Sequence, residues 1–520
     1  MCGIFAIINS HNYDDLRVKE YFNSGKKRGP EYSSFNVIDN FVTFGFHRLA
    51  INGLDQVSNQ PLFHKNLVLI CNGEIYNHEE MKQKFGFKYK TNSDCEIILH
   101  LYDLFGENCV HHLDGVFSFI LYDKDSNKIM ISRDPLGVRP LYICYFFDGV
   151  FGFASDVKPL LFDTEYMKNK SMNQFTPGTF MILKNYSNRY IVEKQQRYYD
   201  ISNGKTCLDF PYFYGKQFYM AQCFEYFENA VKKRVYNCER PIACLLSGGL
   251  DSSVIAAMVS KFYKEKTGNN IETYSIGLKG SEDLKYSKIV ANHIGSIHHQ
   301  IEVTNQDFIN SIPYVIRDVE SYDTTTVRAS VGNWNIGKYI SENSDCKVIF
   351  NGDGADELMG GYLYFHLSPN SEEFDNECRR LLQNISYFDV LRSDKSISSH
   401  GLEPRTPFLD KEFVRYYLSI PKDYRYPIHE SSNLTCEKAF FRTMIDNYAK
   451  DLIPKEILYR RKEAFSDGVS SETKSWYEII QDYVEENKEE IFDENLEYED
   501  KYNYHNIPKT NEQKYYRLLF

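Results

Sequence analysis

Two short stretches of the sequence carry side chains whose types and spacing could perform chemistry. The chain begins MCGIFAII, and removal of Met1, which is usual before a small side chain, would leave Cys2 as the first residue. Cys2 would then carry a thiol with a reference pKa of about 8.5 and a free α-amino group with a reference pKa of about 8. Such a residue combines a nucleophile with a proton acceptor. Cysteine is also a common buried residue, so this stretch alone leaves a structural role open.

The second stretch is LLSGGLDSS at residues 245–253, where an apolar run stops at a Ser-Gly-Gly turn before a predicted helix. Glycines let the backbone approach an anion, and a helix N-terminus presents unpaired N–H groups with partial positive charge. Ser247, Ser252 and Ser253 would add hydroxyl donors. Asp251 would repel phosphate unless it helps to hold a metal, which predicts Mg2+. The alternative is a tight turn that binds no ligand.

The loop at 245–253 lacks the lysine of a Walker loop and the spacing of a dinucleotide-binding fingerprint. It resembles instead the pyrophosphate-binding PP-loop of the ATP-pyrophosphatase enzymes. Those enzymes cleave ATP between its α- and β-phosphates. The resemblance therefore implies a substrate that is adenylated rather than phosphorylated.

The composition is that of a globular protein with more than one domain. A chain of 520 residues is too long for one core, and 42% hydrophobic and 25% charged residues are ordinary fractions. The net charge of −12 argues against a nucleic-acid partner. The twelve cysteines form no Cys-x-x-Cys pair, and no run of about 18 apolar residues predicts a membrane span. Because a signal-peptide pattern is also missing, we expect a cytoplasmic protein with reduced thiols.

The first 200 residues are expected to form antiparallel sheets, because short strands and turns dominate this part of the sequence. Helices are predicted only near 12–24 and 93–105. Many strands with few helices are typical of a sheet sandwich that carries its helices outside. The predicted strands are 3–8, 41–51, 66–73, 115–123, 128–134, 140–146 and 178–184.

From about residue 216 the pattern alternates between helix and strand, which is typical of a parallel α/β domain. The stretch 200–215 is irregular and aromatic, as a linker would be, and the acidic stretch 475–520 is expected to be a solvated helical or partly disordered tail. The predicted elements are helices at 217–236 and 252–265 and strands at 241–246, 272–278, 298–303 and 347–352.

Ordered blocks along nearly the whole chain resemble the glutamine-hydrolysing asparagine synthetases. The resemblance implies an α/β multidomain protein. Residues 1–205 would form an αββα sandwich of the N-terminal-nucleophile hydrolases, and residues 206–520 a parallel-sheet PP-loop domain. Among the blocks that carry the resemblance are NGEIYNH (72–78), RDPLGVRPLY (133–142), LLSGGLDSS (245–253), NGDGADE (351–357) and RRKEAFSDGVS (460–470).

The resemblance implies a glutaminase site in the first domain. Cys2 would attack the side-chain amide of glutamine and release ammonia, and the Asn72 side chain and the Gly73 N–H would stabilise the oxyanion. Without the resemblance, Arg48 and Asp94 could be a surface ion pair and Asn72-Gly73 a hairpin turn. The substrate-binding residues implied are Arg48 for the glutamine carboxylate, Glu74 and Asp94 for its ammonium, and the adjoining Leu49, Ala50, Ile51 and Asn52.

In the second domain the family forms β-aspartyl-AMP from aspartate and ATP, and ammonia then displaces AMP to give asparagine. The resemblance implies that Tyr362 acts in forming the intermediate, that Lys462 neutralises phosphate charge, and that Arg328 helps to bind the reacting groups. Asp251 and Asp356 would hold Mg2+. The ATP-binding positions implied are Leu246, Ser247, Gly249, Asp251, Ser252, Ser253, Ile276, Asn351 and Gly352.

Asp353 departs from the family pattern. The family usually has Ser-Gly-Glu-Gly where this chain has Asn-Gly-Asp-Gly at 351–354. The family glutamate is a candidate base for the attacking ammonia, and aspartate is one methylene shorter. We expect Asp353 to keep that role, since a base must lie within about 3 Å of its proton. The carboxylates at 353, 356 and 357 miss the spacing of a calcium-binding EF-hand loop.

Two sites in one chain imply that ammonia passes between them, and the expected route is apolar. The expected partners are glutamine, aspartate and ATP, with a homodimer by analogy to bacterial relatives. A ring-closing synthetase of the β-lactam or lasso-peptide type is one alternative, but such relatives usually lack the N-terminal cysteine. A non-catalytic relative is another, and the retention of both sets of site residues argues against it.

Overall fold

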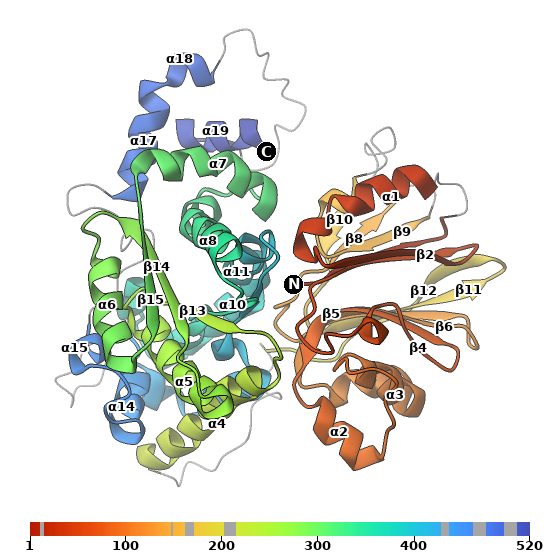
Figure 1. Ribbon diagram of the computed structural model, residues 1–520, viewed down its shortest axis with the longest axis horizontal. Helices are drawn as coiled ribbons and strands as arrows, with labels where there is room; N and C mark the ends of the chain where they lie inside the picture. The colour runs from red at the N-terminus through yellow and green to blue at the C-terminus, as the bar shows by residue number, and fades with distance from the viewer. Residues whose placement is uncertain are drawn as a thin grey trace.

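The computed structural model describes residues 1–10, 15–146, 149–161, 171–201, 215–427, 436–460, 475–492 and 507–520. It consists of two lobes, with the N-terminus between them (Figure 1). The first lobe covers residues 1–201 and the second begins at residue 215. The predicted linker at 200–215 lies mostly outside the described residues. None of the helices in the described ranges combines the length and the apolar character that a bilayer span requires.

The first lobe is a sandwich of two antiparallel six-stranded sheets. Helix α1 (Asp15–Asn23) covers one outer face, and α2 (His78–Phe85) and α3 (Glu96–Phe105) cover the other (Figure 1). This arrangement confirms the predicted αββα sandwich. One sheet contains, in order, β10 (Ser171–Gln174), β8 (Tyr142–Tyr145), β9 (Phe151–Ala154), β1 (Gly3–Ile8), β3 (Val42–Arg48) and β2 (Tyr32–Asp39). The other contains β12 (Arg189–Arg197), β11 (Thr179–Tyr186), β7 (Lys128–Arg133), β6 (Gly115–Asp123), β5 (Leu67–Ile75) and β4 (Leu62–His64).

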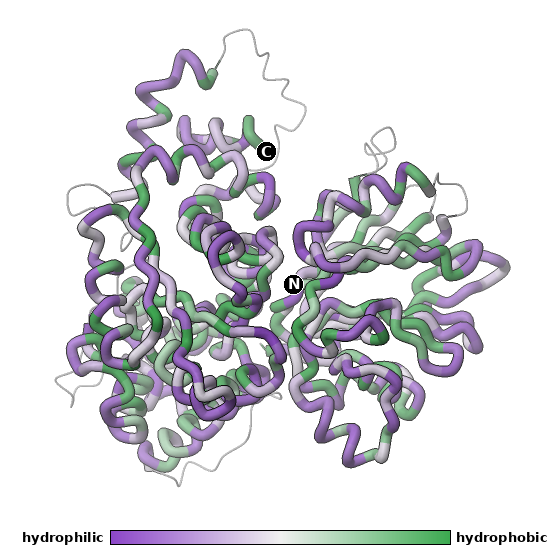
Figure 2. The backbone as a smooth tube through the Cα atoms, viewed as in Figure 1, coloured by the Kyte–Doolittle hydropathy of each residue, from purple (hydrophilic) through white to green (hydrophobic). Residues whose placement is uncertain are grey.

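Strand alternation turns Cys2 and Asn72 toward the space between the two sheets. Successive side chains of a strand point to opposite faces. On β1, Ile4 and Ile8 belong to the core between the sheets, and Cys2 packs against the same core. On β5, Ile70 belongs to that core, and Asn72 follows it two residues later on the same face. Figure 2 shows many hydrophobic residues along the central strands of the sandwich.

The second lobe is built on a parallel sheet, as predicted, and a fifth strand, β17, joins the four that were predicted. Its strand order runs outward in both directions from β13, so the loop after β13 lies where the order reverses. Ligands of open α/β sheets bind at such a switch point. The sheet contains, in order, β15 (Ile297–Val303), β14 (Glu272–Leu278), β13 (Ile242–Leu245), β16 (Val348–Phe350) and β17 (Glu403–Arg405).

Helices surround this sheet and build the rest of the second lobe (Figure 1). The first two, α4 and α5, were predicted from the sequence. The helices are α4 (Lys216–Tyr236), α5 (Leu250–Thr267), α6 (Glu282–Ile294), α7 (Asn305–Val319), α8 (Thr324–Asn343), α9 (Ala355–Met359), α10 (Ser371–Asn384), α11 (Asp389–Ser398), α12 (Lys411–Ser419), α13 (Lys422–Arg425), α14 (Ala439–Tyr448), α15 (Lys455–Leu458), α17 (Trp476–Glu486), α18 (Lys488–Ile491) and α19 (Asn511–Leu519).

The prediction of a solvated tail at 475–520 is wrong for the described part of that stretch. Helices α17 and α19 pack beside α7 (Figure 1), and Trp476 and Tyr516 are buried in the core of the second lobe. The ring of Trp476 lies edge-on to Phe308, with 5.2 Å between centroids. Trp476, Ile480 and Val484 recur every fourth residue and form an apolar helix face. The surrounding acidic residues hide this pattern in the sequence.

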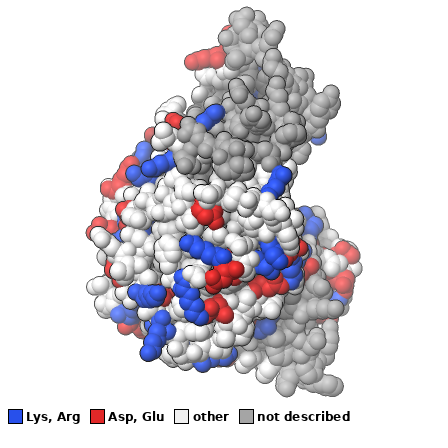
Figure 3. Space-filling model, turned by 90° about the vertical axis from the view of Figure 1, so that its right-hand side faces the viewer, with Lys and Arg blue, Asp and Glu red and all other residues white. Residues whose placement is uncertain are grey.

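The lobes meet through buried ion pairs, among them Arg28 with Asp394 at 2.8 Å, and through an apolar contact that belongs to the core of the second lobe. Leu49, Ile51, Leu136 and Val138 of the first lobe are members of the same buried cluster as Leu246. The apolar part of this interface is compatible with the expected route for ammonia. Figure 3 shows one side of the molecule. On that side, Lys and Arg side chains are interspersed with Asp and Glu side chains and do not form a patch of one charge.

Candidate active sites

Cys2 lies at the contact between the lobes with its thiol in an apolar environment. Its Sγ donates to the carbonyl of Leu49 at 3.5 Å. Burial raises the pKa of this thiol to about 11. The ammonium of Met1 donates to the carbonyl of Leu402 in the second lobe at 3.0 Å, and burial lowers the pKa of this amine to about 5. At neutral pH the Cys2 thiol is therefore protonated, and the buried surroundings of the N-terminus keep an amine uncharged. The uncharged amine is the form that accepts a proton.

Asn72 and Gly73 are in the middle of β5, so the hairpin-turn alternative is wrong. The Asn72 side chain is buried, and neither its Nδ2 nor its Oδ1 has a hydrogen-bond partner among the described residues. Buried amides are rarely left unpaired, and one that is invites a ligand. A Cβ at Gly73 would lie 2.5 Å from the carbonyl oxygen of Val116 on β6, so only glycine fits there.

An Asn72→Ala variant is therefore expected to lower kcat for glutamine hydrolysis by about 10²–10³, because one preorganised oxyanion donor is lost. The melting temperature should change little, since the Asn72 side chain has no hydrogen-bond partner among the described residues. Glutamate release and thermal unfolding measure the two effects. A parent-like rate of glutamate release would remove Asn72 from the oxyanion site.

Arg48 is buried and is held by the loop that follows β3. Its Nη1 donates to the carbonyl of Asp55 at 2.9 Å and to Oδ1 of Asn59 at 2.7 Å. Its Nη2 donates to the carbonyls of Asn52, at 3.3 Å, and Gly53. The guanidinium is thus fixed in direction by neutral acceptors and keeps its positive charge for an anion.

Asp94 and Glu74 are both buried, and Asp94 forms no ion pair with Arg48, so the surface-pair alternative is wrong. Oδ2 of Asp94 accepts the Ile75 N–H at 2.6 Å. Glu74 is held from the second lobe, where Nη2 of Arg405 lies 3.1 Å from its Oε2. Burial raises the pKa of both carboxyls above their ordinary values. An ammonium ligand would compensate this buried negative charge.

The segment 49–52 connects the first site to the second lobe. The Arg240 Nε donates to the carbonyl of Ala50 at 2.8 Å, and the Glu239 N–H donates to the carbonyl of Ile51 at 3.1 Å. Asn52 donates from Nδ2 to Glu74 at 2.6 Å. A movement of the segment 49–52 would therefore shift residues of both lobes that are hydrogen-bonded to it.

The loop after β13 has the geometry of an anion cradle. Gly248 has a φ of 75°, and a Cβ there would lie 2.5 Å from the backbone of Tyr286 and Ser287. The hydroxyls of Ser247 and Ser252 lie 3.0 Å apart, and Oγ of Ser253 is buried without a hydrogen-bond partner among the described residues. No side chain caps the N-terminus of α5. Hydroxyls and N–H groups are thus available to a phosphate.

The other predicted ATP positions surround this cradle. Leu246 directly follows β13, Ile276 lies in β14, and Asn351 and Gly352 follow β16. A Cβ at Gly352 would lie 2.9 Å from Cβ of Asp251, so the glycine lets these two segments touch. The structure therefore brings the predicted adenosine and phosphate positions together at the carboxyl ends of three neighbouring strands.

Asp251 and Asp356 both contact the ammonium of Lys438, at 2.5 and 2.6 Å. Sequence reasoning missed Lys438, which belongs to no motif. Among the described residues, Oδ1 of Asp251 is buried without a hydrogen-bond partner, and no group of three or more His, Cys, Asp or Glu side chains could hold a metal ion. Two carboxylates beside a phosphate cradle fit Mg2+, which takes one or two carboxylates and completes its shell with water and phosphate.

Asp353 lies beside this pair. Its Oδ2 accepts from Nδ2 of Asn351 at 2.8 Å, and burial raises the pKa of its carboxyl. The Tyr362 hydroxyl donates to Glu357, another residue that sequence reasoning did not single out, and burial raises the pKa of the tyrosine. The remaining predicted residue, Lys462, lies outside the described residues.

Arg328, at the start of α8, is bound by the C-terminal helix. Its Nε donates to Oε1 of Glu512 on α19 at 2.7 Å, and its Nη2 contacts the second carboxylate oxygen. The guanidinium lies 4.3 Å above the ring of Tyr477. Glu512 is buried, and sequence reasoning missed it because it lies in the stretch predicted to be a tail. The carboxylate of Glu512 thus binds the guanidinium of Arg328, which was predicted to bind the reacting groups.

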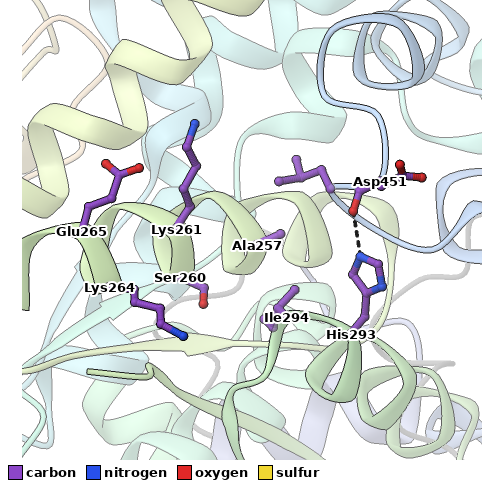
Figure 4. Close-up of a pocket in the computed structure, with 9 residues that line it drawn as sticks. Ala257, Ser260, Lys261, Lys264, Glu265, His293, Ile294 and Asp451 are labelled. Carbon is purple, nitrogen blue, oxygen red and sulfur yellow. Dashed lines mark hydrogen bonds between the residues drawn. The ribbon is translucent and has the colours of Figure 1, made fainter. Parts of the chain in front are cut away.

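A surface hollow of about 460 Å³ lies apart from both sites, on the C-terminal half of α5 (Figure 4). Lys261, Lys264 and Glu265 project from α5, and Nε2 of His293 on α6 lies 2.8 Å from the carbonyl oxygen of Asp451. At 1.5 Å per residue, Lys261 is about 15 Å along the helix from Asp251. The hollow therefore contains none of the predicted site residues.

Comparison with known proteins gives matches over the whole chain. A family model described as glutamine amidotransferase domain matches residues 1–201, and one described as asparagine synthase matches residues 223–377 and 366–505. The curated asparagine synthetase (glutamine-hydrolyzing) of Cricetulus griseus is 41% identical over 546 aligned positions, which cover 100% of this chain and 93% of that protein. The proteins of the same name from Gallus gallus and Homo sapiens are each 40% identical, with the same coverage.

Proposed function

The chain belongs to the family of glutamine-hydrolysing asparagine synthetases, and from this membership and the geometry above we propose how its two lobes divide the reaction. It makes asparagine from aspartate, with nitrogen from glutamine and energy from ATP, through β-aspartyl-AMP. AMP, pyrophosphate and glutamate are the other products. Identity of about 40% over the full chain, across both site regions, carries this conclusion. We place the division between glutaminase and synthetase domains at residues 205/206.

In the glutaminase domain, Cys2 attacks the amide carbon of glutamine after Met1 has been removed. The thiol proton passes to the α-amino group of Cys2 and from there to the departing nitrogen, which leaves as ammonia. Water then hydrolyses the thioester to glutamate. The unpaired amide of Asn72 and the N–H of Gly73 receive the oxyanion. Arg48 binds the glutamine carboxylate, and Glu74 and Asp94 bind its ammonium, together with the segment 49–52.

In the synthetase domain, an oxygen of the β-carboxylate of aspartate attacks the α-phosphorus of ATP, and pyrophosphate leaves into the cradle after β13. Asp251 and Asp356 would hold Mg2+, which neutralises phosphate charge when it is bound. Leu246, Ile276 and Asn351, with the adjoining Gly352, bind the adenosine. The pyrophosphate-binding residues are Ser247, Gly249, Asp251, Ser252 and Ser253.

Ammonia then attacks the acyl carbon of β-aspartyl-AMP, and AMP leaves. Asp353 accepts the proton that the attacking nitrogen loses, and burial, which raises the pKa of its carboxyl, makes it a stronger base than an ordinary aspartate. Tyr362 and Lys462 act near the intermediate, and Arg328 binds a negative group of the reactants. The family resemblance further supports a homodimer and a cytoplasmic location, which gel filtration with light scattering and cell fractionation test.

Each half can be tested separately. Glutamate should form from glutamine without ATP, and aspartate-dependent exchange of labelled pyrophosphate into ATP should proceed without glutamine. Omission of Mg2+ should stop the exchange and spare glutamate formation. Pyrophosphate exchange that proceeds without aspartate would contradict the proposed roles of the two domains. Glutamate formation in a protein that shows no pyrophosphate exchange would also contradict them.

The contact of Arg328 with Glu512 provides a test of the aspartate site. If Arg328 binds aspartate, Glu512 competes with the substrate, and a Glu512→Gln variant is expected to lower KM for aspartate severalfold without changing KM for glutamine. Steady-state kinetics with varied aspartate measure this. Glu485→Gln, an exposed change on the neighbouring α17, is the control. An unchanged or raised KM for aspartate in Glu512→Gln would show that Arg328 does not bind it.

A further inference from the structure

Lys438 places a buried positive charge between the two carboxylates of the proposed metal site. Its side chain is 1% exposed, and Nζ lies 2.5 Å from Oδ2 of Asp251 and 2.6 Å from Oδ1 of Asp356. Two carboxylates this close to one point would repel each other without a cation. A buried charge is tolerated only with such partners. Lys438 therefore makes the pair stable when no metal is bound.

The backbone holds Lys438 in a conformation that lysine rarely adopts. Lys438 is the N-cap of α14 and has a φ of 57°. Arg442 fixes this turn, because its N–H donates to the carbonyl of Lys438 at 3.0 Å and its Nε donates to the carbonyl of Glu437 at 2.9 Å. Arg442 also pairs with the Glu437 side chain. Strained residues of this kind persist where the surroundings enforce them, often at functional sites.

Gly361 provides the space for the lysine. A Cβ at this position would lie 2.3 Å from Cε of Lys438 and 2.0 Å from Oδ1 of Asp356. Both atoms belong to the contact between the ammonium and the carboxylates, so any larger residue at 361 would disturb it. Three features therefore place the ammonium of Lys438 between the two carboxylates. They are the ion pairs, the backbone conformation of Lys438 and the space left by Gly361.

We propose that Lys438 is a built-in cation which occupies the divalent-metal position between Asp251 and Asp356 while the nucleotide site is empty, and which the metal–ATP complex displaces toward the phosphate oxygens. The proposal rests on the metal position given under the proposed function. Oδ1 of Asp251, which has no hydrogen-bond partner among the described residues, is a ligand position beside the ammonium. Lys438 is therefore a positioning residue.

Competition at this point makes metal binding depend on nucleotide. Without ATP, a divalent cation must displace an ammonium whose ion pairs among the described residues are those with Asp251 and Asp356, so binding is weak. With ATP, the displaced ammonium gains phosphate oxygens as new partners, and the metal and the lysine are both neutralised. The enzyme would accordingly take up the metal with ATP rather than before it.

The direct test is binding of Mn2+ in the absence of nucleotide, measured by electron paramagnetic resonance of the free ion. A Lys438→Met variant is expected to bind Mn2+ at least tenfold more tightly than the parent, and adding Asp251→Asn is expected to abolish the gain. The matched control is Lys233→Met, because Lys233 also bridges two carboxylates, Asp114 and Asp410, and none of these three residues belongs to the proposed metal position. Its Mn2+ affinity should equal that of the parent.

Thermal unfolding gives a readout that does not depend on catalysis. In EDTA, Lys438→Met should melt below the parent, and Mg2+ should restore most of the loss. Lys233→Met should show a loss that Mg2+ does not restore. Lys438→Gln, which removes the charge and leaves both carboxylates in place, should reproduce the tighter Mn2+ binding and serves if Lys438→Met does not fold.

The outcomes separate the two levels of the proposal. Unchanged or weaker Mn2+ binding in both Lys438→Met and Lys438→Gln would overturn the role of Lys438. Tighter binding that survives the addition of Asp251→Asn would place the metal elsewhere, and would overturn both this inference and the proposed metal position.

Discussion

A Cys2→Ala variant should lose glutamine-dependent asparagine formation on the order of a thousandfold or more, and should keep the parent rate with ammonium chloride as nitrogen source. The thiol is the only nucleophile proposed for the glutaminase step, and removal of a nucleophile leaves only the residual effect of binding and the oxyanion donors. The synthetase lobe would be unaffected, because ammonia from solvent can still reach the acyl-adenylate. Asparagine formed from each nitrogen source is the measurement.

Cys109→Ala, a change at a buried cysteine elsewhere in the same lobe, is the matched control and should leave both activities near the parent level. Mass spectrometry of the intact parent should also show Met1 removed, since only then does Cys2 have a free amine. Substantial glutamine-dependent activity in Cys2→Ala, or in protein that retains Met1, would contradict the assignment.

An Asp353→Asn variant should lose asparagine formation from both glutamine and ammonia by about 10²–10⁴, the usual contribution of a general base. Glutamate release should persist, because that reaction takes place in the other lobe. Aspartate-dependent exchange of pyrophosphate into ATP should also persist, since adenylation precedes the step that needs the base. Asparagine formation at the parent rate in Asp353→Asn would refute the role.

The pH dependence of the ammonia reaction follows from the direction of the Asp353 shift. A base acts when deprotonated, so the rate at a fixed concentration of free ammonia should fall as the pH falls through the pKa of Asp353. An ordinary aspartate has a pKa of about 4. Because burial raises the pKa of Asp353, the fall in rate should occur at a higher pH than that. Asp353→Glu, which restores the usual family side chain, is the control that should retain activity and shift the profile.

Local patterns were sufficient to predict the strands that carry the sites. The strand predicted at 115–123 is observed as β6 with the same bounds, because apolar residues there are bounded by turn residues on both sides. The helix predicted at 252–265 is observed as α5, two residues longer at each end. The loop between β13 and α5 could be recognised because glycine, serine and aspartate are all local to one turn.

Contacts between residues far apart in the sequence could not be predicted. Lys438 is 187 residues from Asp251, and Glu512 is 184 residues from Arg328. Neither residue belongs to a motif. Their contacts form only when helices α14 and α19 pack against other helices of the second lobe. Trp476 was missed for a related reason, because an acidic sequence can still place one apolar face on a core.

The most direct test of the account is the product balance of the complete reaction. Purified protein is incubated with glutamine, aspartate, ATP and Mg2+, and asparagine, AMP and pyrophosphate are counted together with ADP and phosphate. The account predicts one AMP and one pyrophosphate for each asparagine, with at least one glutamate. Release of ADP and phosphate, or AMP formed without asparagine, would contradict it.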